Sequence, residues 1–300
     1  MPSAVIQLNF DPSLRVGGQA VRWEILALAA VILLAMLVAA LVAGRAPTQS
    51  ADGRSLRRDD LLFIALGIVP GAVLGGRLTY VLIHLDYYLA NPNSILDPSS
   101  GGLALTGAVV LGTLTGMYVA RLLDAPVGRW LDLAAVALVM GLGLGKLSEV
   151  LGGSGQGVIS GVSWATAYVG PGPWGVLGPG LPAHPAQVYE ALGDALVLAC
   201  ILVLGQFGSF RAGDGRRFLV ALGGWAIVRF IVVFSWRDAP VAGPLRAEQL
   251  LDLGLLLIVA LFLVVIVQRP ATIAEMASSN TSPTVPTGAP SSTAPREDAP

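Results

Sequence analysis

The chain has 300 residues, of which 54% are hydrophobic and only 12% are charged, and its formal net charge is −1. A soluble domain carries about 25% charged residues, so this composition and a mean hydropathy of +0.73 indicate a membrane protein. The near-zero net charge provides no basic field for nucleic acid, and a single cysteine excludes a disulfide within the chain.

Seven hydrophobic segments follow one another, each about 20 residues long, which is the length needed to cross a ~30 Å hydrocarbon core. They are roughly 22–43, 61–83, 103–121, 131–151, 186–205, 217–236 and 248–267. The segments predict an all-α polytopic membrane protein with seven transmembrane helices. The first segment is too long, and follows too long a lead, for a typical cleaved signal peptide, so we interpret it as a span.

These segments divide the chain into three parts. Residues 1–21 form an external N-terminal arm, and residues 22–268 form a seven-helix membrane domain with outer loops 84–102 and 152–185. Residues 269–300 are rich in Pro, Ser, Thr and Ala. Such a composition cannot bury an apolar face, so we expect a disordered cytoplasmic tail.

Basic residues alternate between the loops and predict the orientation of the chain. Those that follow the first, third, fifth and seventh segments are Arg45, Arg54, Arg57, Arg58, Arg121, Arg129, Arg211, Arg216, Arg217 and Arg269. Loops 84–102 and 152–185 contain no Lys or Arg. The positive-inside rule therefore places the N-terminus outside and the C-terminus inside. Arg237 and Arg246, in the third outer connection, oppose the rule and suggest another role, although arginines at helix ends also snorkel to the interface.

Charged side chains inside the segments are few, and most of them fall in the outer half. The stretch GLGLGKLSEVLGG places Lys146 and Glu149 three residues apart on one face of a helix. Charges that face lipid are costly, so we expect a shared polar cavity open to the outer leaflet, in which basic groups suit a lipid phosphate. The alternative is that Lys146 and Glu149 form an ion pair that only holds helices together.

Glycines in GAVLGG and GLGLG bring helix backbones close together, and we interpret them as packing contacts. No strand precedes GLGLG, so it is not a dinucleotide-binding motif. Two histidines and one cysteine are too few for a His-rich or Cys-based metal site, and we expect neither a metal nor a cofactor.

Several stretches together resemble the phosphatidylglycerol–prolipoprotein diacylglyceryl transferase family over about residues 8–268. They are HPAQVYEA at His184–Ala191, GGRLTYVL at Gly75–Leu82, VRFIVVF at Val228–Phe234 with QLLDLG at Gln249–Gly254, and FDP at Phe10–Pro12 followed by VRWEI at Val21–Ile25. Their order and spacing carry the resemblance, and the family also has seven spans and an external N-terminus.

The resemblance implies transfer of the diacylglyceryl group from phosphatidylglycerol to the lipobox cysteine of a prolipoprotein, with a thioether formed and glycerol phosphate released. The implied partners are phosphatidylglycerol, prolipoprotein signal peptides and the lipid bilayer, without nucleic acid, in the plasma (inner) membrane of a bacterium. A thiolate is the required nucleophile, and fixed donors must hold the leaving phosphate. The substrate-binding residues that it implies are Arg77, Tyr80, Gly157, His184, Gln187, Tyr189, Glu190, Arg229 and Arg237.

The chain departs from the family pattern at the residues expected to carry the chemistry. Thr106 stands where the family has a histidine, and Glu24 where it has a tyrosine. Lys146 and Glu149 replace the arginine and asparagine of G-R-x-G-N-F, and Val233 replaces a glutamate. Threonine is no general base near neutral pH, whereas a buried lysine or glutamate can become one. We therefore take Lys146, Glu149, Glu24 and Thr106 as candidate catalytic residues.

Two interpretations follow from these departures. The chain runs the same transfer with a rearranged set of acids and bases, or it is a divergent, non-catalytic paralogue that binds phospholipid or lipoprotein precursors on the same fold. A small transporter is disfavoured because the sequence shows no internal repeat.

Overall fold

The computed structural model describes residues 5–45, 58–97, 102–210 and 213–279. Its long helices are α1 (Trp23–Arg45), α2 (Arg58–Ile83), α4 (Leu105–Leu122), α5 (Val127–Val150), α6 (Ala186–Gln206), α7 (Arg216–Val232) and α8 (Ala247–Ser279). Short helical turns are α3 (Leu85–Ala90), η1 (Pro92–Ile95) and η2 (Val233–Ser235).

Within these ranges, seven helical segments are long and apolar enough to cross a membrane, which confirms the predicted all-α polytopic fold. Each lies within a few residues of its predicted segment; the largest difference is at the start of α5, which begins at Val127. Helix α8 continues to Ser279, past the predicted end of the last span. Residues 280–300 of the predicted tail, and Arg54, Arg57 and Arg211, lie outside the described residues. The orientation of the termini stays a prediction.

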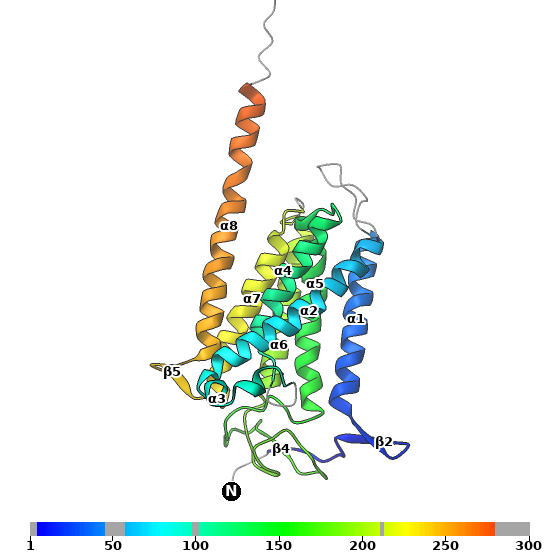
Figure 1. Ribbon diagram of the computed structural model, residues 1–300, viewed down its shortest axis with the longest axis vertical. Helices are drawn as coiled ribbons and strands as arrows, with labels where there is room; N and C mark the ends of the chain where they lie inside the picture. Colours follow the sequence, from blue (N-terminus) through cyan, green and yellow to red (C-terminus); the bar gives the residue numbers. More distant parts are fainter. Residues whose placement is uncertain (1–4, 46–57, 98–101, 211–212, 280–300) are drawn as a thin grey trace, which may run out of the picture. The chain divides into compact units, whose positions relative to one another are not determined.

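Short strands and irregular loops lie together at one end of the helices (Figure 1). Strand β1 (Ile6–Leu8) pairs in parallel with β4 (Thr166–Tyr168), which joins the N-terminal arm to loop 152–185. Strands β2 (Ser13–Val16) and β3 (Gln19–Arg22) form an antiparallel hairpin, as do β5 (Pro240–Ala242) and β6 (Leu245–Arg246). The first hairpin turns at Gly17 and Gly18, whose φ angles of +58° and +85° suit a two-glycine turn.

The FDP stretch belongs to this arm and has a structural role. Phe10 packs edge-on against Trp174 of loop 152–185, with ring centroids 4.9 Å apart. The carboxylate of Asp11 accepts hydrogen bonds from the backbone and hydroxyl of Ser13, and these bonds hold the pKa of Asp11 below its usual value. The motif therefore begins the hairpin that leads into α1.

Helices α2 and α4 pack closely because glycines meet at their contact. A Cβ atom added at Gly75 would collide with the carbonyl oxygen of Gly107, and one added at Gly107 would collide with that of Gly75. Gly71 faces Thr115 in the same way. The structure thus supports the packing interpretation of the GAVLGG stretch.

Helix α5 neighbours α1, α6 and α7 and forms the centre of the membrane domain. Its start is joined to α7 by Asp132, which is buried inside the bundle. The Asp132 carboxylate accepts hydrogen bonds from the backbone N–H groups of Gly215, Arg217 and Phe218 at 3.1, 2.8 and 3.4 Å. These groups begin α7 and would otherwise lack partners, so Asp132 fixes α7 beside α5.

Candidate active site

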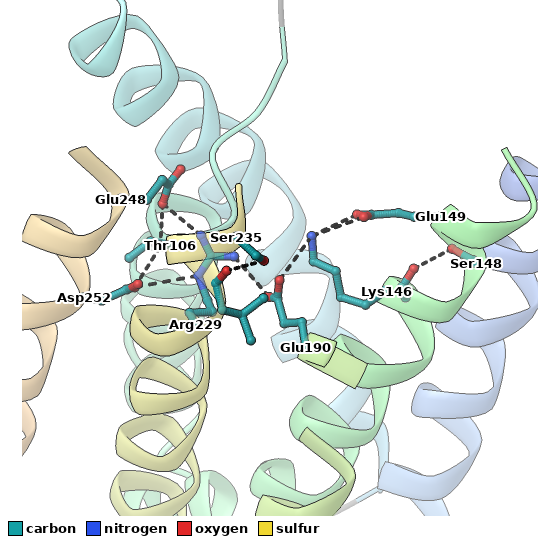
Figure 2. Close-up of polar contacts among 11 residues, drawn as sticks. Thr106, Lys146, Ser148, Glu149, Glu190, Arg229, Ser235, Glu248 and Asp252 are labelled. Atoms are coloured by element: carbon teal, nitrogen blue, oxygen red, sulfur yellow. Dashed lines mark hydrogen bonds and ion pairs between the residues drawn. The ribbon is translucent and has the colours of Figure 1, made fainter. Parts of the chain in front are cut away.

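Arg229 is the centre of a buried ion cluster near the end of α7 (Figure 2). Its side chain is 1% exposed, and its guanidinium lies 3.2 Å from Glu190 Oε1 and 2.9 Å from Glu248 Oε2. Asp252 Oδ1 lies 3.6 Å from Nε. Carboxylates from α6 and α8 thus surround the guanidinium, and such a buried charge requires partners of this kind.

Lys146 lies at the more accessible side of the same cluster. Its ammonium is 3.0 Å from Glu149 Oε1 on α5 and 3.6 Å from Glu190 Oε2 on α6. The side chains of Lys146 and Glu149 are 11% and 26% exposed, against 1% for Arg229. Glu190 therefore joins the two cations, and Lys146 is the one that a ligand reaches more easily.

Thr106, on α4, lies on the side of the cluster formed by the two carboxylates of α8. Its hydroxyl donates to Glu248 Oε2 at 3.2 Å and lies 3.5 Å from Asp252 Oδ1. The side chain is buried. Thr106 therefore supports the two carboxylates of α8 that hold Arg229, and it provides no proton acceptor of its own.

Trp236 covers both cations of the cluster. Its ring centroid lies 5.0 Å from the Arg229 guanidinium carbon and 5.5 Å from Lys146 Nζ, distances at which cation–π attraction operates. Arg246 holds the backbone around it by donating to the carbonyl oxygens of Trp236 at 3.0 Å and Asp238 at 2.7 Å. The role suggested for Arg246 by its position in an outer connection is thus structural.

Asp194 adds an unpartnered carboxyl one turn below Glu190 on α6. It is 1% exposed, and neither of its oxygens has a hydrogen-bond partner in the described residues. Gly143 of α5 faces it, and a Cβ atom there would lie 3.0 Å from Asp194 Cβ. Lys146 and Arg229 are thus outnumbered by the acidic groups around them, and the cluster is rich in carboxyls rather than in cations.

His184 and Tyr189 form a second polar group, at the start of α6. Nδ1 of His184 lies 3.0 Å from the Tyr189 hydroxyl, which accepts a hydrogen bond of 2.7 Å from Trp164 Nε1. Both line an open cavity of about 410 Å³ together with Val158, Ile231, Val232, Phe234 and Ser235. The predicted residues of HPAQVYEA thus divide between two places, with Glu190 in the ion cluster and His184 and Tyr189 in this cavity.

Gly157 and Gln187 connect these groups to the outer loop. A Cβ atom at Gly157 would collide with the carbonyl oxygen of Ser235, so glycine permits the loop to approach the end of α7. Gln187 donates to the hydroxyl of Tyr168 at 3.3 Å, and that hydroxyl donates to the carbonyl of Val150 at 2.9 Å. Burial raises the pKa of Tyr168 to about 12. Both predicted residues therefore organise the loop around the site.

Arg77 and Tyr80 lie apart from the cluster, at loop 84–102. The Arg77 guanidinium donates to the backbone carbonyls of Ser94, Ile95 and Asp97 at 2.6–2.9 Å, and it also reaches Gly102. The ring of Tyr80 stacks on His84, with centroids 4.2 Å apart. Arg77 is thus engaged with the loop backbone, and its predicted contact with substrate remains a prediction.

Glu24 and Arg237 also lie outside the cluster. Glu24 pairs with Arg22 at 2.8 Å, and Arg22 donates to the carbonyl of Gly152 just after α5. Arg237 is exposed beyond η2. The structure therefore brings together Thr106, Lys146, Glu149, Glu190 and Arg229 among the predicted site residues.

The predicted catalytic and substrate-binding residues did not include Asp252, Asp194 and Trp236, nor Glu248, which was expected only as one of the charges in the outer half of the membrane. The acidic residues were visible as charges inside or at the start of apolar segments, which is itself a signal of function or pairing. No signal in the sequence distinguished Trp236 from a tryptophan at a membrane interface, where that residue is common.

An apolar cavity of about 870 Å³ lies between α1, α2, α4 and α5, beside Phe218 of α7. Its walls are almost entirely aliphatic, with Thr113 and Trp130 among the few exceptions. Its lining is hydrophobic, and its volume lies within the range of about 300–1,000 Å³ that is typical of ligand pockets.

A family model described as prolipoprotein diacylglyceryl transferase matches residues 13–266. A phosphatidylglycerol–prolipoprotein diacylglyceryl transferase of Geobacter sulfurreducens is 33% identical over 222 residues, which cover 72% of this chain and 82% of the relative. A protein of the same name from Polynucleobacter necessarius is 31% identical, over 77% of this chain and 84% of its own length. One from Trichormus variabilis is 27% identical, over 84% and 88%. The chain therefore belongs to the prolipoprotein diacylglyceryl transferase family.

Proposed function

We propose that the chain transfers the diacylglyceryl group of phosphatidylglycerol to the cysteine thiol of a prolipoprotein signal peptide. The setting is the plasma (inner) membrane of a bacterium, with the N-terminus outside. The observation that carries this proposal is the family match over residues 13–266, supported by relatives that bear this activity in their names and align over most of their length.

In this proposal the headgroup binds at the Lys146 side of the cluster, and the exposure of the two cations supports that choice. Arg229 already has carboxylates around its whole guanidinium and is 1% exposed, so it lacks room for a phosphate. Lys146 is more exposed and pairs with Glu149, which is itself the most exposed acid of the cluster. A phosphate that enters beside Lys146 replaces Glu149 as its partner, and the ammonium then stabilises the negative charge of the leaving glycerol phosphate.

Arg229 acts in this scheme as a positioning residue. It orients Glu190, which in turn lies 3.6 Å from the Lys146 ammonium. The cavity of about 870 Å³ has an apolar lining that suits acyl chains, and part of this lining belongs to α5, the helix that carries Lys146.

A non-catalytic paralogue is the second candidate, and one observation favours it. Thr106, which stands where the family has a histidine, donates its hydroxyl to Glu248 and Asp252, and these carboxylates hold Arg229. Lys146 and Glu149, which also depart from the family pattern, pair with each other, so three of the departing residues have partners within the ion cluster. A retired active site filled by ion pairs would have this arrangement.

Complementation separates the two candidates. The full chain is expressed in a bacterium depleted of its own prolipoprotein diacylglyceryl transferase, and a reporter lipoprotein is examined by mass spectrometry. Growth and a thioether-linked diacylglyceryl group on the reporter cysteine support the enzyme. Correctly inserted protein without lipidation of the reporter overturns it and favours the paralogue.

A further inference from the structure

The thiol substrate requires a proton acceptor, because the thiolate rather than the thiol is the nucleophile. Thr106 is buried and directs its hydroxyl to Glu248 and Asp252, so it cannot serve. Glu149 pairs with Lys146 and is the carboxylate that an entering phosphate displaces in the proposed scheme, so it is the alternative acceptor. An imidazole is better matched to a thiol, because the ordinary pKa of histidine, about 6.5, lies nearer to that of cysteine, about 8.5, than does the ordinary pKa of glutamate, about 4.3.

The two imidazoles of the chain have different surroundings. His84 is exposed, and its Nδ1 lies 2.9 Å from the carbonyl oxygen of Tyr80. His184 is partly buried and lines the cavity of about 410 Å³ at the junction of loop 152–185, α6 and η2. His184 therefore borders a cavity that can hold part of a second molecule.

Backbone hydrogen bonds hold His184 in a defined position. Its N–H donates to the carbonyl of Val158 at 3.0 Å, and its carbonyl accepts from Gly157 at 2.8 Å. The N–H of Val158 donates in turn to the carbonyl of Ser235 at 2.8 Å. The backbone of His184 is thus held by the loop, and the loop is held by Ser235, so the position from which the imidazole enters the cavity is fixed.

The side-chain contacts of Tyr189 define a path for a proton. Trp164 Nε1 can only donate, so the Tyr189 oxygen accepts that bond of 2.7 Å. The hydroxyl hydrogen of Tyr189 is then available for His184 Nδ1, which lies 3.0 Å away. In this arrangement Tyr189 joins the cavity to the basic nitrogen of the imidazole.

The rest of the cavity suits an apolar peptide segment. Val158, Val232, Ile231 and Phe234 are aliphatic or aromatic, and the last two are 62% and 49% exposed at the surface of the membrane domain. A signal peptide presents an apolar segment followed by small residues. The neighbour of the cavity residue Ser235 is Trp236, whose ring contacts Lys146 and Arg229. The cavity therefore adjoins the headgroup side of the ion cluster.

We propose that this cavity, defined by His184, Tyr189 and Ser235, is the thiol subsite of the chain and that His184 and Tyr189 together deprotonate the substrate cysteine. The inference rests on the proposed transferase function. The thiol proton passes to the Tyr189 oxygen as the tyrosine hydrogen passes to His184 Nδ1. The sulfur electron pair forms the C–S bond, and the C–O bond breaks with its electron pair retained by the phosphate oxygen. The imidazolium then returns the proton to the released glycerol phosphate.

The first experiment measures transfer from phosphatidylglycerol to a peptide with a lipobox cysteine, using the full chain in detergent, for His184→Gln and Tyr189→Phe. We expect His184→Gln to lower kcat by about 100-fold or more, the range of general-base catalysis, with KM for phosphatidylglycerol unchanged. The same replacement at the other imidazole, His84→Gln, is the matched control and leaves kcat unchanged. Equal rates in His184→Gln and wild type overturn the proposal.

The pH profile separates catalysis from a structural role. The base must be unprotonated, so the wild-type rate rises with pH as the base loses its proton. Tyr189 is the titratable group that faces His184, while Trp164 and Ser235 are polar without titrating in this range, and the remaining cavity residues are apolar. His184→Gln loses this rise while its thermal stability stays within a few degrees of wild type. A rise that persists in His184→Gln contradicts the assignment.

The second experiment does not depend on activity. In the Ser235→Cys variant, the peptide thiol is trapped as a mixed disulfide by copper phenanthroline. We expect trapping at the new cysteine and not at native Cys200, which is exposed on α6 and serves as the internal control. Trapping without any wild-type transfer refutes the proposed function but supports the thiol subsite. Equal trapping at both positions, or none, refutes the subsite.

Discussion

The ammonium of Lys146 lies 3.0 Å from Glu149 Oε1 and is also within 3.6 Å of Glu190 Oε2 on the neighbouring helix. The pair that stood out in the sequence is therefore one end of a longer ion cluster that continues to Arg229 and α8. This connection gives the pair two possible uses, as a phosphate anchor and as a tie between α5 and α6. Substitutions at Lys146 distinguish these two uses.

Lys146→Met removes the more accessible cation of the cluster. We expect a loss of about 100-fold in kcat/KM for phosphatidylglycerol, comparable to the loss of one charge-stabilising donor from an active site. Lys146→Arg, which keeps the charge, restores part of the activity. Steady-state kinetics with purified protein measure both changes. If Lys146→Met lowers thermal stability but leaves kcat/KM intact, the pair is structural.

Arg229→Met removes the guanidinium from the buried carboxylate of Asp252 and the partly buried one of Glu248, and it leaves Glu190 with Lys146 alone. Removing one partner of a buried ion pair costs about 3–5 kcal/mol, so we expect a large loss of stability in detergent. Thermal unfolding followed by circular dichroism measures it. Arg121→Met, at an exposed position on α4, is the matched control and should change little. A stable Arg229→Met protein would show that the carboxylates do not depend on the guanidinium.

Asp194→Asn should be tolerated. The carboxyl of Asp194 has neither a cation within ion-pair distance nor a hydrogen-bond partner in the described residues, so a neutral group of the same shape removes no favourable contact. Asp252→Asn, in contrast, weakens the ion pair with Arg229 and should lower the unfolding temperature. The two variants are compared by thermal unfolding at neutral pH. A larger loss in Asp194→Asn would reveal a stabilising partner that the contacts do not show.

The burial of the Tyr168 hydroxyl leads us to expect a loss of folding stability at alkaline pH. Burial raises the folded-state pKa of Tyr168 to about 12, against about 10 in the unfolded chain. The stabilisation is complete below about pH 10 and is lost as the pH rises through about 12, and its size is roughly 2–3 kcal/mol. Unfolding free energy measured between these limits should fall more steeply in wild type than in Tyr168→Phe. Parallel curves would mean that Tyr168 titrates equally in both states.

Gly75→Val should disrupt the contact between α2 and α4. The new Cβ atom would collide with the carbonyl oxygen of Gly107, and the backbone there cannot move aside without separating the helices. We expect a loss of about 1–3 kcal/mol or more, typical of overpacking. Gly254→Val on α8 is the control, because no other atom lies within 4 Å of its added Cβ. Equal thermal stabilities of the two variants would contradict this account.

The sequence by itself determined the seven spans and, through motifs spread over most of the chain, the family. Hydropathy over about 20 residues is a local property, because a helix in a bilayer satisfies its backbone hydrogen bonds within one segment. The cost of placing a charge in the bilayer identified Lys146 and Glu149 as groups that need partners, and the family resemblance added Glu190 and Arg229. The sequence by itself could not name those partners.

The tertiary structure decided the pairing. Two carboxylates that accept hydrogen bonds from Arg229 belong to Glu190, 39 residues before it, and to Glu248, 19 residues after it. The spacing of charges along α6, α7 and α8 does not reveal which of these side chains meet. The tertiary structure also showed that Arg77, which the family resemblance suggested as a substrate-binding residue, donates to loop carbonyls and lies apart from the cluster. The sequence shows where an ionisable residue lies in a membrane helix, and burying its charge there without a partner costs free energy. Only the packing of separate helices shows which group pairs with it and offsets that cost.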